Sequence, residues 1–307
     1  MARTRQPGSD VPDRGASVRF ALSSASGKTA GLGELPPALR AFDNVGSRFD
    51  ERYGRWASVQ AQRRAVRREM LRAFPRGSSL LELGGGTGDD AVFLAEQGFR
   101  ILLTDGAPAM LRCANEKIGH AGLEQQIATH CVPLERLDEI VQHPRPGFSE
   151  PFDGAYSVFA ALNCVPDLTA LARPLAALLR PGAACLLVMF GPCSPGEILI
   201  QLLRGDLSAA FRRLRRGPVP ARLAGQDFTV WYPRPSEVAH AWQPYFRLRR
   251  VRGIGILVPP SAAEPWISGF PRFLNLLEVA DRMLAAPLAL LGDHVLLHFE
   301  RTGQVAG

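Results

Sequence analysis

The sequence predicts an α/β fold: a doubly wound, mostly parallel sheet of seven strands, with an N-terminal helical segment and a helical lid insertion. Apolar and amphipathic segments alternate from residue 79 to residue 190, which is the pattern of a parallel sheet with helices on both faces. A glycine-rich turn, residues 84–88, follows the first apolar segment. Two further extended segments, 245–258 and 295–299, are expected to pair and complete the sheet.

The composition is that of a globular protein. The 307 residues are 46% hydrophobic and 21% charged, and the mean hydropathy is −0.01. The longest apolar runs, 183–190 and 283–291, are far shorter than the roughly 18–20 residues of a membrane-spanning helix. Residues 6–19 are polar and contain no hydrophobic stretch of a secretion signal. We therefore expect a cytoplasmic protein.

The cysteines argue against two kinds of site, whereas the net charge leaves several kinds of partner open. The five cysteines are scattered and form no C-x-x-C pair, so we expect neither a zinc ribbon nor a redox dithiol, and no metal site. The net charge is +7, and arginine supplies most of the cationic groups, since only Lys28 and Lys117 are lysines. This charge is compatible with nucleic acid, anionic lipid and acidic substrates. The sequence does not fix the oligomeric state.

The N-terminal part divides into a tail and a helical cap. Residues 1–37 are rich in Gly, Ser, Ala and Pro and lack apolar periodicity, which predicts a disordered tail. Residues 38–77 are predicted to form the N-terminal helical cap, whose helical pattern is interrupted near Tyr53 and Gly54 and ends at Pro75.

Residues 78–190 are predicted to form a cofactor-binding core with five strands. Each strand is a short apolar run that ends at glycine, proline or polar residues. The predicted strands are 79–83, 100–104, 127–132, 152–159 and 183–190, and the predicted helices are 89–97, 107–118 and 168–179. Parallel strands place their carboxyl ends along one edge of the sheet, where ligands bind in such folds.

Residues 191–307 are predicted to form an acceptor and lid region that completes the sheet. Within this region, 198–214 have the periodicity of one amphipathic helix, and arginines flank its apolar positions as far as residue 216. Such a segment can close over an acceptor site or lie on an anionic membrane. We expect the lid, and peripheral membrane contact through 198–216 is the alternative. The segments that follow are predicted to be extended at 228–232, helical at 236–242 and mostly helical at 260–291.

The glycine-rich turn predicts a nucleoside site. Gly84 and Gly86 match two glycines of the dinucleotide fingerprint, but Asp89 takes the place of the third and would repel a pyrophosphate. No Gly-Lys-Ser/Thr follows, which excludes a phosphate-binding P-loop. Asp105 ends the second strand, where a carboxylate can accept both hydroxyls of a ribose. The combination indicates a nucleoside that carries an amino acid.

Four segments, in the proper order, resemble motifs of class I S-adenosylmethionine-dependent methyltransferases. Residues 80–88, LLELGGGTG, resemble the family's first motif, and 104–111, TDGAPAML, resemble its acidic second motif. Residues 152–157 resemble the fourth-strand motif, and 179–182 resemble the turn before strand five. The pairs Phe42-Asp43 and Phe49-Asp50 are similar to a segment upstream of many small-molecule methyltransferases. The resemblance implies a Rossmann-like fold and S-adenosylmethionine as the cofactor.

The resemblance also implies a role for individual residues. Glu82 would approach the methionine amino group, Asp105 would hold the ribose hydroxyls, and Phe159 would line the methionine end. Four glycines would let the cofactor pass close to the backbone, namely Gly84, Gly85, Gly86 and Gly88. Four other residues would surround the adenine of the cofactor, namely Ala107, Met110, Pro133 and Leu134.

The resemblance leaves the acceptor open, and we assign no catalytic residue from the sequence. Methyl transfer from a sulfonium is an in-line displacement, which needs alignment of the reactants and exclusion of water. Residues 163–166, Asn-Cys-Val-Pro, lack the Asn/Asp-Pro-Pro-aromatic motif of adenine and cytosine N-methyltransferases, so nucleic acid is disfavoured as acceptor. The alternative is an RNA-modification protein or a cofactor-binding regulatory protein. The only feature of the sequence that supports this alternative is its positive net charge.

The segments outside the core predict a small, lipophilic or aromatic acceptor, methylated on oxygen, nitrogen or carbon. Their aromatic residues, with the end of the fifth strand, are candidates for the acceptor pocket. These residues are Phe190, Trp231, Tyr232, Trp242, Trp266, Phe270 and Phe273. His240 and Tyr232 are candidate bases, whereas His294 and His298 are expected to be packed in or beside the last strand.

Overall fold

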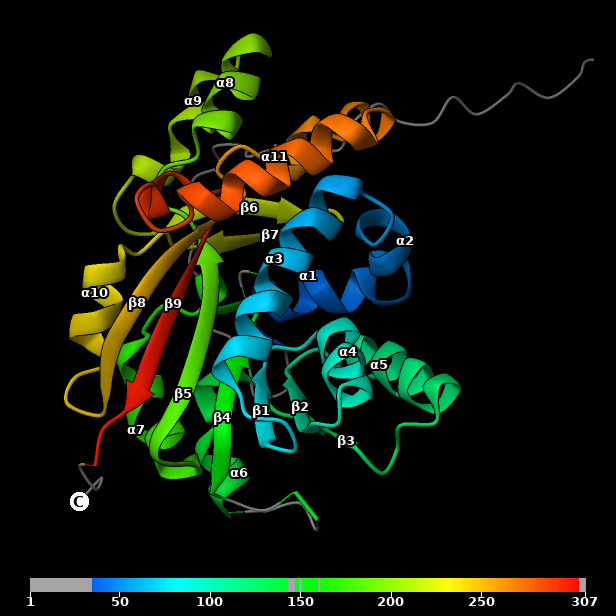
Figure 1. The fold of residues 1–307 in the computed structure, drawn as a ribbon, viewed down its shortest axis with the longest axis vertical. Coiled ribbons are helices and arrows are strands. Elements are labelled where there is room, and N and C mark those ends of the chain that lie inside the picture. Colours follow the sequence, from blue (N-terminus) through cyan, green and yellow to red (C-terminus); the bar gives the residue numbers. More distant parts are fainter. Residues whose placement is uncertain (1–34, 143–146, 149–150, 160, 304–307) are drawn as a thin grey trace, which may run out of the picture.

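The computed structural model describes residues 35–142, 147–148, 151–159 and 161–303. Its main feature is the predicted sheet of seven strands, in the order β3-β2-β1-β4-β5-β9-β8 (Figure 1). The predicted fold class is therefore confirmed. The predicted disordered tail, residues 1–37, lies almost wholly outside the described residues.

Five parallel strands form most of the sheet, and β9 pairs antiparallel with β5 and with β8, so that β8 runs in the same direction as the five. The parallel strands are β1 (Ser79–Leu83), β2 (Arg100–Asp105), β3 (Ile127–Cys131), β4 (Phe152–Ser157) and β5 (Leu179–Phe190). β9 (His294–Arg301) lies between β5 and β8 (Phe246–Ile254). β1 is buried along almost its whole length, which explains its continuous apolar sequence.

Helices cover both faces of the sheet, and each face has its own apolar core. One face packs against α3 (Ala57–Ala73), α4 (Asp89–Glu96) and α5 (Pro108–Ala121), and the other packs against α6 (Asp138–Gln142), α7 (Thr169–Leu178) and α10 (Pro235–Ala241). The ends of α5 follow from its sequence: Pro108 lies in the first turn, where its missing N–H costs nothing, and Gly122 ends the helix with φ +66°.

The N-terminal segment lies beside the carboxyl ends of the parallel strands. It consists of α1 (Pro37–Val45), a 3₁₀ helix (Gly46–Arg48) and α2 (Phe49–Tyr53). Asp43 Oδ1 accepts the Ala109 N–H at 2.6 Å and so caps α5, which has no capping side chain of its own. Asp50 accepts the Thr87 hydroxyl at 2.7 Å and pairs with Lys117 Nζ at 2.6 Å. Both Phe-Asp pairs therefore attach this segment to the core through their carboxylates.

The single helix predicted over 198–214 is wrong. The structure has α8 (Pro195–Leu203), α9 (Leu207–Ala210) and a 3₁₀ helix (Arg212–Leu214) in its place. Gly205 adopts φ +75°, which interrupts the helix, and Asp206 Oδ1 accepts the Ala209 N–H at 2.8 Å to start the next one. The apolar periodicity of the sequence continues across this break, so the periodicity did not indicate where the helix ends.

A hairpin after this segment was also missed in part. β6 (Val219–Leu223) pairs with β7 (Gln226–Val230), and only the second strand was expected. Pro220 argues against a strand in the sequence, but an edge strand tolerates it. Ala224 and Gly225 form the turn, and both have positive φ.

The chain between β8 and β9 is mostly helical, as predicted. α11 (Pro271–Leu284) packs against α3 (Figure 1). The other 3₁₀ helices of the described chain are Leu134–Arg136, Ala161–Cys164, Ser261–Ala263, Trp266–Gly269 and Ala289–Leu291. Among the described residues, no helix has the length and apolar character that crossing a bilayer requires.

Candidate active site

A cavity opens at the carboxyl ends of β1, β2 and β4, with a volume of about 1050 Å³ including its mouth. The glycine-rich turn, the end of β2 and the N-terminal segment line it. Among the predicted cofactor residues, those that line the cavity are Glu82, Gly84, Gly85, Gly86, Asp105, Met110, Leu134 and Phe159. Gly88, Ala107 and Pro133 lie behind this lining.

The glycines let the turn pack closely against neighbouring segments. A Cβ at Gly84 would lie 2.5 Å from the Ala161 Cβ, and one at Gly85 would lie 2.7 Å from the carboxyl carbon of Glu82. Gly84 also adopts φ +66°, which favours glycine. Gly88 instead allows close helix packing. A Cβ at this position would lie 3.1 Å from the Ala114 Cβ of α5. Gly88 therefore lets α4 and α5 approach each other.

Asp105 is held in place by backbone donors. Its Oδ2 accepts the Gly86 N–H at 2.8 Å and its Oδ1 accepts the Ala107 N–H at 2.8 Å. Burial raises the pKa of this carboxyl, and the two N–H groups oppose the rise. Each carboxylate oxygen keeps a second lone pair. Asp105 can therefore accept two more hydrogen bonds from a ligand in the cavity.

Glu82 is a buried carboxyl without a full set of partners. The residue is 2% exposed, and its Oε2 has no hydrogen-bond partner among the described residues. Burial raises the pKa of Glu82 well above its ordinary value, and the negative charge of Asp90 adds to the rise. The hydroxyl of Tyr156 opposes the rise through a hydrogen bond, and Arg63, which also lines the cavity, opposes it through its positive charge. A cationic ligand group beside Glu82 would supply the missing partner and favour the ionised carboxylate.

We expect Glu82→Gln to increase the free energy of unfolding at pH 8 by about 1–3 kcal/mol, because the amide removes a buried, poorly paired charge. The pKa of Glu82 is higher in the folded than in the unfolded chain, so the wild type loses stability as pH rises between these two values. Denaturant unfolding between pH 4 and pH 8 measures the difference, which should vanish at the acidic end.

The exposed Glu135, which lines the same cavity, provides the control as Glu135→Gln. Equal stability of wild type and Glu82→Gln at pH 8 would show that Glu82 is well paired in the folded protein.

Comparison with known proteins identifies the family to which the chain belongs. The sequence profile of a family described as "Methyltransferase domain" matches residues 56–252, which is more than half of the chain. The chain belongs to this methyltransferase family. The methyl donor of the methyltransferase is S-adenosylmethionine, as predicted. No curated protein sequence matches the chain.

Solved structures share the fold at low sequence identity. The CcbJ methyltransferase from Streptomyces caelestis is 13% identical, with a TM-score of 0.53 over 86% of this chain and 98% of that chain. The DhpI–SAH complex is 15% identical, with a TM-score of 0.51 over 87% and 97%. The [4+2]-cyclase SpnF is 12% identical, with a TM-score of 0.53 over 89% and 99%. Because this last protein is a cyclase, likeness of fold does not identify an acceptor.

The methyltransferase has a second buried polar cluster beside the cavity, which the sequence did not reveal. Arg213 Nη2 contacts Asp293 Oδ1 at 2.6 Å, and Arg213 Nε contacts Glu197 Oε2 at 2.5 Å. Burial opposes ionisation of Asp293, but Arg213 outweighs it and the pKa of Asp293 is lowered. Gln62 Nε2 donates to Asp293 Oδ2 at 3.1 Å, and Gln62 Oε1 lies 2.9 Å from His294 Nδ1.

These contacts fix the tautomer of His294. An ionised Asp293 only accepts hydrogen bonds, so it must face the amino group of Gln62. The carbonyl oxygen of Gln62 then faces His294, and Nδ1 must donate to it. Burial lowers the pKa of His294 to about 4, so the ring is neutral near pH 7 and its Nε2 carries a lone pair.

His294 is buried next to Phe159 and is not itself among the residues that line the cavity. Its ring is stacked on Phe190 at 5.0 Å between ring centres and meets the edge of Phe159 at 5.3 Å. Phe159 lines the cavity and has φ +54°, a strained value for a non-glycine residue. The expectation that His294 is packed or hydrogen-bonded in or beside the last strand is confirmed, but the sequence did not identify its partner. The Gln62–His294 contact spans 232 positions of the chain, and no local pattern encodes such a contact.

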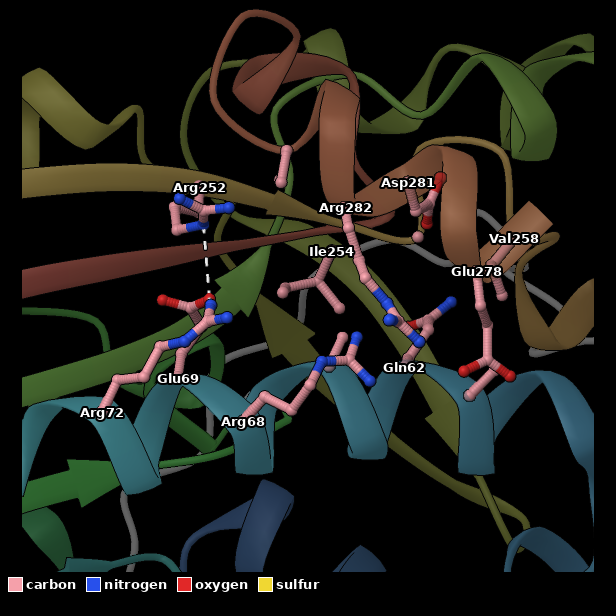
Figure 2. Close-up of a pocket in the computed structure, with 15 residues that line it drawn as sticks. Gln62, Arg68, Glu69, Arg72, Arg252, Ile254, Val258, Glu278, Asp281 and Arg282 are labelled. Atoms are coloured by element: carbon pink, nitrogen blue, oxygen red, sulfur yellow. Dashed lines mark hydrogen bonds and ion pairs between the residues drawn. The ribbon is translucent and has the colours of Figure 1, made fainter. Parts of the chain in front are cut away.

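A second cavity lies on the other side of α3, between α3, β8 and α11 (Figure 2). Its volume is about 620 Å³ including the mouth. Gln62 lines this cavity, whereas the neighbouring Arg63 lines the first one. Helix α3 therefore separates the two cavities.

The aromatic residues proposed for the acceptor pocket do not line the first cavity. Trp242 is fully buried in the core and donates its indole N–H to the Leu168 carbonyl at 3.1 Å, so its assignment to the pocket is wrong. Phe42 and Phe49 of the N-terminal segment line the cavity instead. The candidate base His240 is exposed on α10.

Proposed function

We propose that the cavity binds S-adenosylmethionine and that the methyltransferase methylates an O–H or N–H group of a small, lipophilic or aromatic acceptor. One observation supports the cofactor site above all. Two backbone N–H groups hold the Asp105 carboxylate in place, and each of its oxygens can still accept a hydrogen bond from a ligand. Residues 78–190 would hold the cofactor, and the segments 38–77 and 191–307 would frame the acceptor.

The described residues fit the cofactor. Asp105 offers two acceptor positions to the ribose hydroxyls, and the unpartnered Oε2 of Glu82 suits the methionine ammonium. A Cβ built at Gly86 meets no atom within 4 Å, so the space beside this glycine of the turn is free for a ligand. Met110 and Leu134 offer apolar surface for the adenine.

The rest of the lining supports an apolar acceptor. Phe42 and Phe49 bring aromatic rings from the N-terminal segment, and Val158 and Val165 add aliphatic surface from the opposite side. The total volume of about 1050 Å³ exceeds what a cofactor of this size fills alone. An acceptor of modest size can therefore share the cavity with the cofactor.

His294 is the group that would take the acceptor's proton. S-adenosylmethionine supplies an electrophilic methyl group when it is bound. In the displacement, the carbon–sulfur bond of the donor would break and S-adenosylhomocysteine would leave as the acceptor oxygen or nitrogen takes the methyl group, and the acceptor's proton would move to the lone pair on Nε2 of His294. The proton is released to solvent, and Gln62 keeps the ring in the same tautomer for the next cycle.

We expect the full-length chain to bind S-adenosylhomocysteine in isothermal calorimetry and NAD not to compete with it. The free acceptor sites of Asp105 favour a ribose, while Asp89 and Asp90 line the cavity and disfavour a pyrophosphate. Binding of NAD without binding of S-adenosylhomocysteine would contradict the proposed site. Incubating cell extracts with methyl-labelled S-adenosylmethionine, followed by mass spectrometry, then identifies the acceptor.

A further inference from the structure

Helix α8 exposes its apolar face. Leu203 is 80% exposed, and Leu207 at the start of α9 is 65% exposed. The buried side chains of α8 are polar, Glu197 and Gln201. This is the reverse of the usual arrangement, in which the apolar face packs on the core. Further exposed apolar side chains of this segment are Leu199, Leu202, Phe211 and Leu214.

An ionic contact fixes this rotation of α8. Glu197 pairs with both Arg212 and Arg213, and Arg213 is held in turn by Asp293 of the core. Turning the leucines inward would pull Glu197 out of this cluster and leave Arg213 with a buried, partly unpaired charge. The exposed apolar face is thus a stable feature of the fold.

Helix α11 shares part of this arrangement, although its buried side carries Leu274 as well as Glu278. Glu278 pairs with Arg64 of α3, and Asp281 accepts the N–H groups of Ile256 and Leu257 at 3.1 and 2.6 Å. Figure 2 shows Glu278 and Arg282 extending from α11 toward α3. The opposite side of the helix carries exposed apolar residues at helical spacing, namely Phe273, Leu276, Val279 and Met283. Polar contacts orient this helix too.

The segment just before α11 adds aromatic surface. Trp266 is 65% exposed, and its ring contacts the half-exposed Phe270 at 5.2 Å between ring centres. Figure 1 shows α8, α9 and α11 at the same end of the molecule, beyond the carboxyl ends of the parallel strands. The exposed apolar side chains are therefore gathered at one end of the protein.

The charges around this surface are cationic. Arg204, Arg215, Arg216 and Arg272 are exposed, and none forms an ion pair within the described chain. The carboxylates of the same helices are used elsewhere: Glu197, Glu278 and Asp281 face inward, and Asp206 caps α9. Apolar residues bordered by arginine, with tryptophan beside them, are the pattern of a helix that lies in a membrane interface.

We propose that α8, α9, the segment 266–270 and α11 form a membrane-binding surface for anionic lipid bilayers. This surface goes beyond the proposed function, and its test needs neither cofactor nor acceptor. A second copy of the chain fits less well. A symmetric dimer would place each patch against itself, so the arginines would face arginines without compensating carboxylates. Lipid phosphates supply the missing negative charge.

We expect the full-length chain to sediment with vesicles made of equal parts of phosphatidylcholine and phosphatidylglycerol, and not with phosphatidylcholine alone. The double variant Arg215→Gln/Arg216→Gln should bind about 25-fold more weakly, at about fivefold per arginine. Leu203→Asp/Leu207→Asp should weaken binding at least tenfold, because it places charge in the apolar face.

The control is Leu71→Asp/Val141→Asp, which makes the same kind of change at exposed residues of α3 and α6 and should bind like the wild type. Circular dichroism and the thermal melting temperature, measured on each variant, show whether the fold is intact. The proposal is overturned if the wild type does not bind anionic vesicles at low salt. It is also overturned if the wild type is a dimer without vesicle affinity that Leu203→Asp/Leu207→Asp turns into a monomer.

Discussion

Replacing His294 with glutamine is expected to lower kcat for methyl transfer by about 100- to 10,000-fold, the usual contribution of a positioned general base. Affinity for S-adenosylhomocysteine should stay within about twofold, because His294 is not among the residues that line the cofactor cavity. The measurement pairs steady-state kinetics on the identified acceptor with calorimetry. An unchanged kcat would show that His294 is only packed between Phe159 and Phe190.

The tautomer of His294 can be tested without an acceptor. Nitrogen chemical shifts of the imidazole, assigned by their loss in His294→Gln, should show a protonated Nδ1 and an unprotonated Nε2 from pH 5.5 to pH 8. The pKa of His294 is lowered to about 4, so kcat/KM should fall only as pH drops toward that value. Gln62→Met should preserve the neutral ring but mix its tautomers, with a smaller loss of kcat. A ring that titrates near pH 6.5 would contradict the proposed network.

Asp105→Ala is expected to weaken S-adenosylhomocysteine binding by about 10- to 150-fold, or about 1.5–3 kcal/mol. The variant removes the two acceptor positions that we propose for the ribose hydroxyls, and it also frees the N–H groups of Gly86 and Ala107. Calorimetry measures the affinity, and circular dichroism should show an intact fold because the residue lies at a strand end.

Asp153→Ala is the matched control. Asp153 also accepts a backbone N–H, that of Ser79 at 2.8 Å, but it lies at the start of β4, beside the start of β1 and away from the cavity. This variant should bind S-adenosylhomocysteine like the wild type. Unchanged binding by Asp105→Ala would instead show that Asp105 serves only to hold the turn.

The sequence predicted the features whose causes are local. The strands of the core lie within a few residues of the predicted ones, because each is a short apolar run bounded by turn residues. Gly84, Gly86 and Asp105 were found because the turn and the second strand carry them at a recognisable spacing. The gathering of Glu82, Asp105 and Phe159 around one cavity follows from the parallel order of β1, β2 and β4.

What the sequence could not predict depends on contacts between distant segments. The tautomer of His294 depends on Gln62, and the rotation of α8 depends on the contact of Glu197 with Arg213. Periodicity shows where the apolar face of a helix lies, but not which face the core will cover. On α8, the ion pairs of Glu197 determine which face is buried. Leu203 and Leu207 are therefore exposed to solvent.

The position of β9 has a consequence for how the protein is made. β9 is the last strand in sequence, yet it lies between β5 and β8 and pairs with both. During synthesis, β5 and β8 therefore wait with unpaired edges until residues 294–301 have been translated, and open edges of this kind promote aggregation. A premature stop codon before residue 294 would remove an interior strand of the sheet rather than its rim.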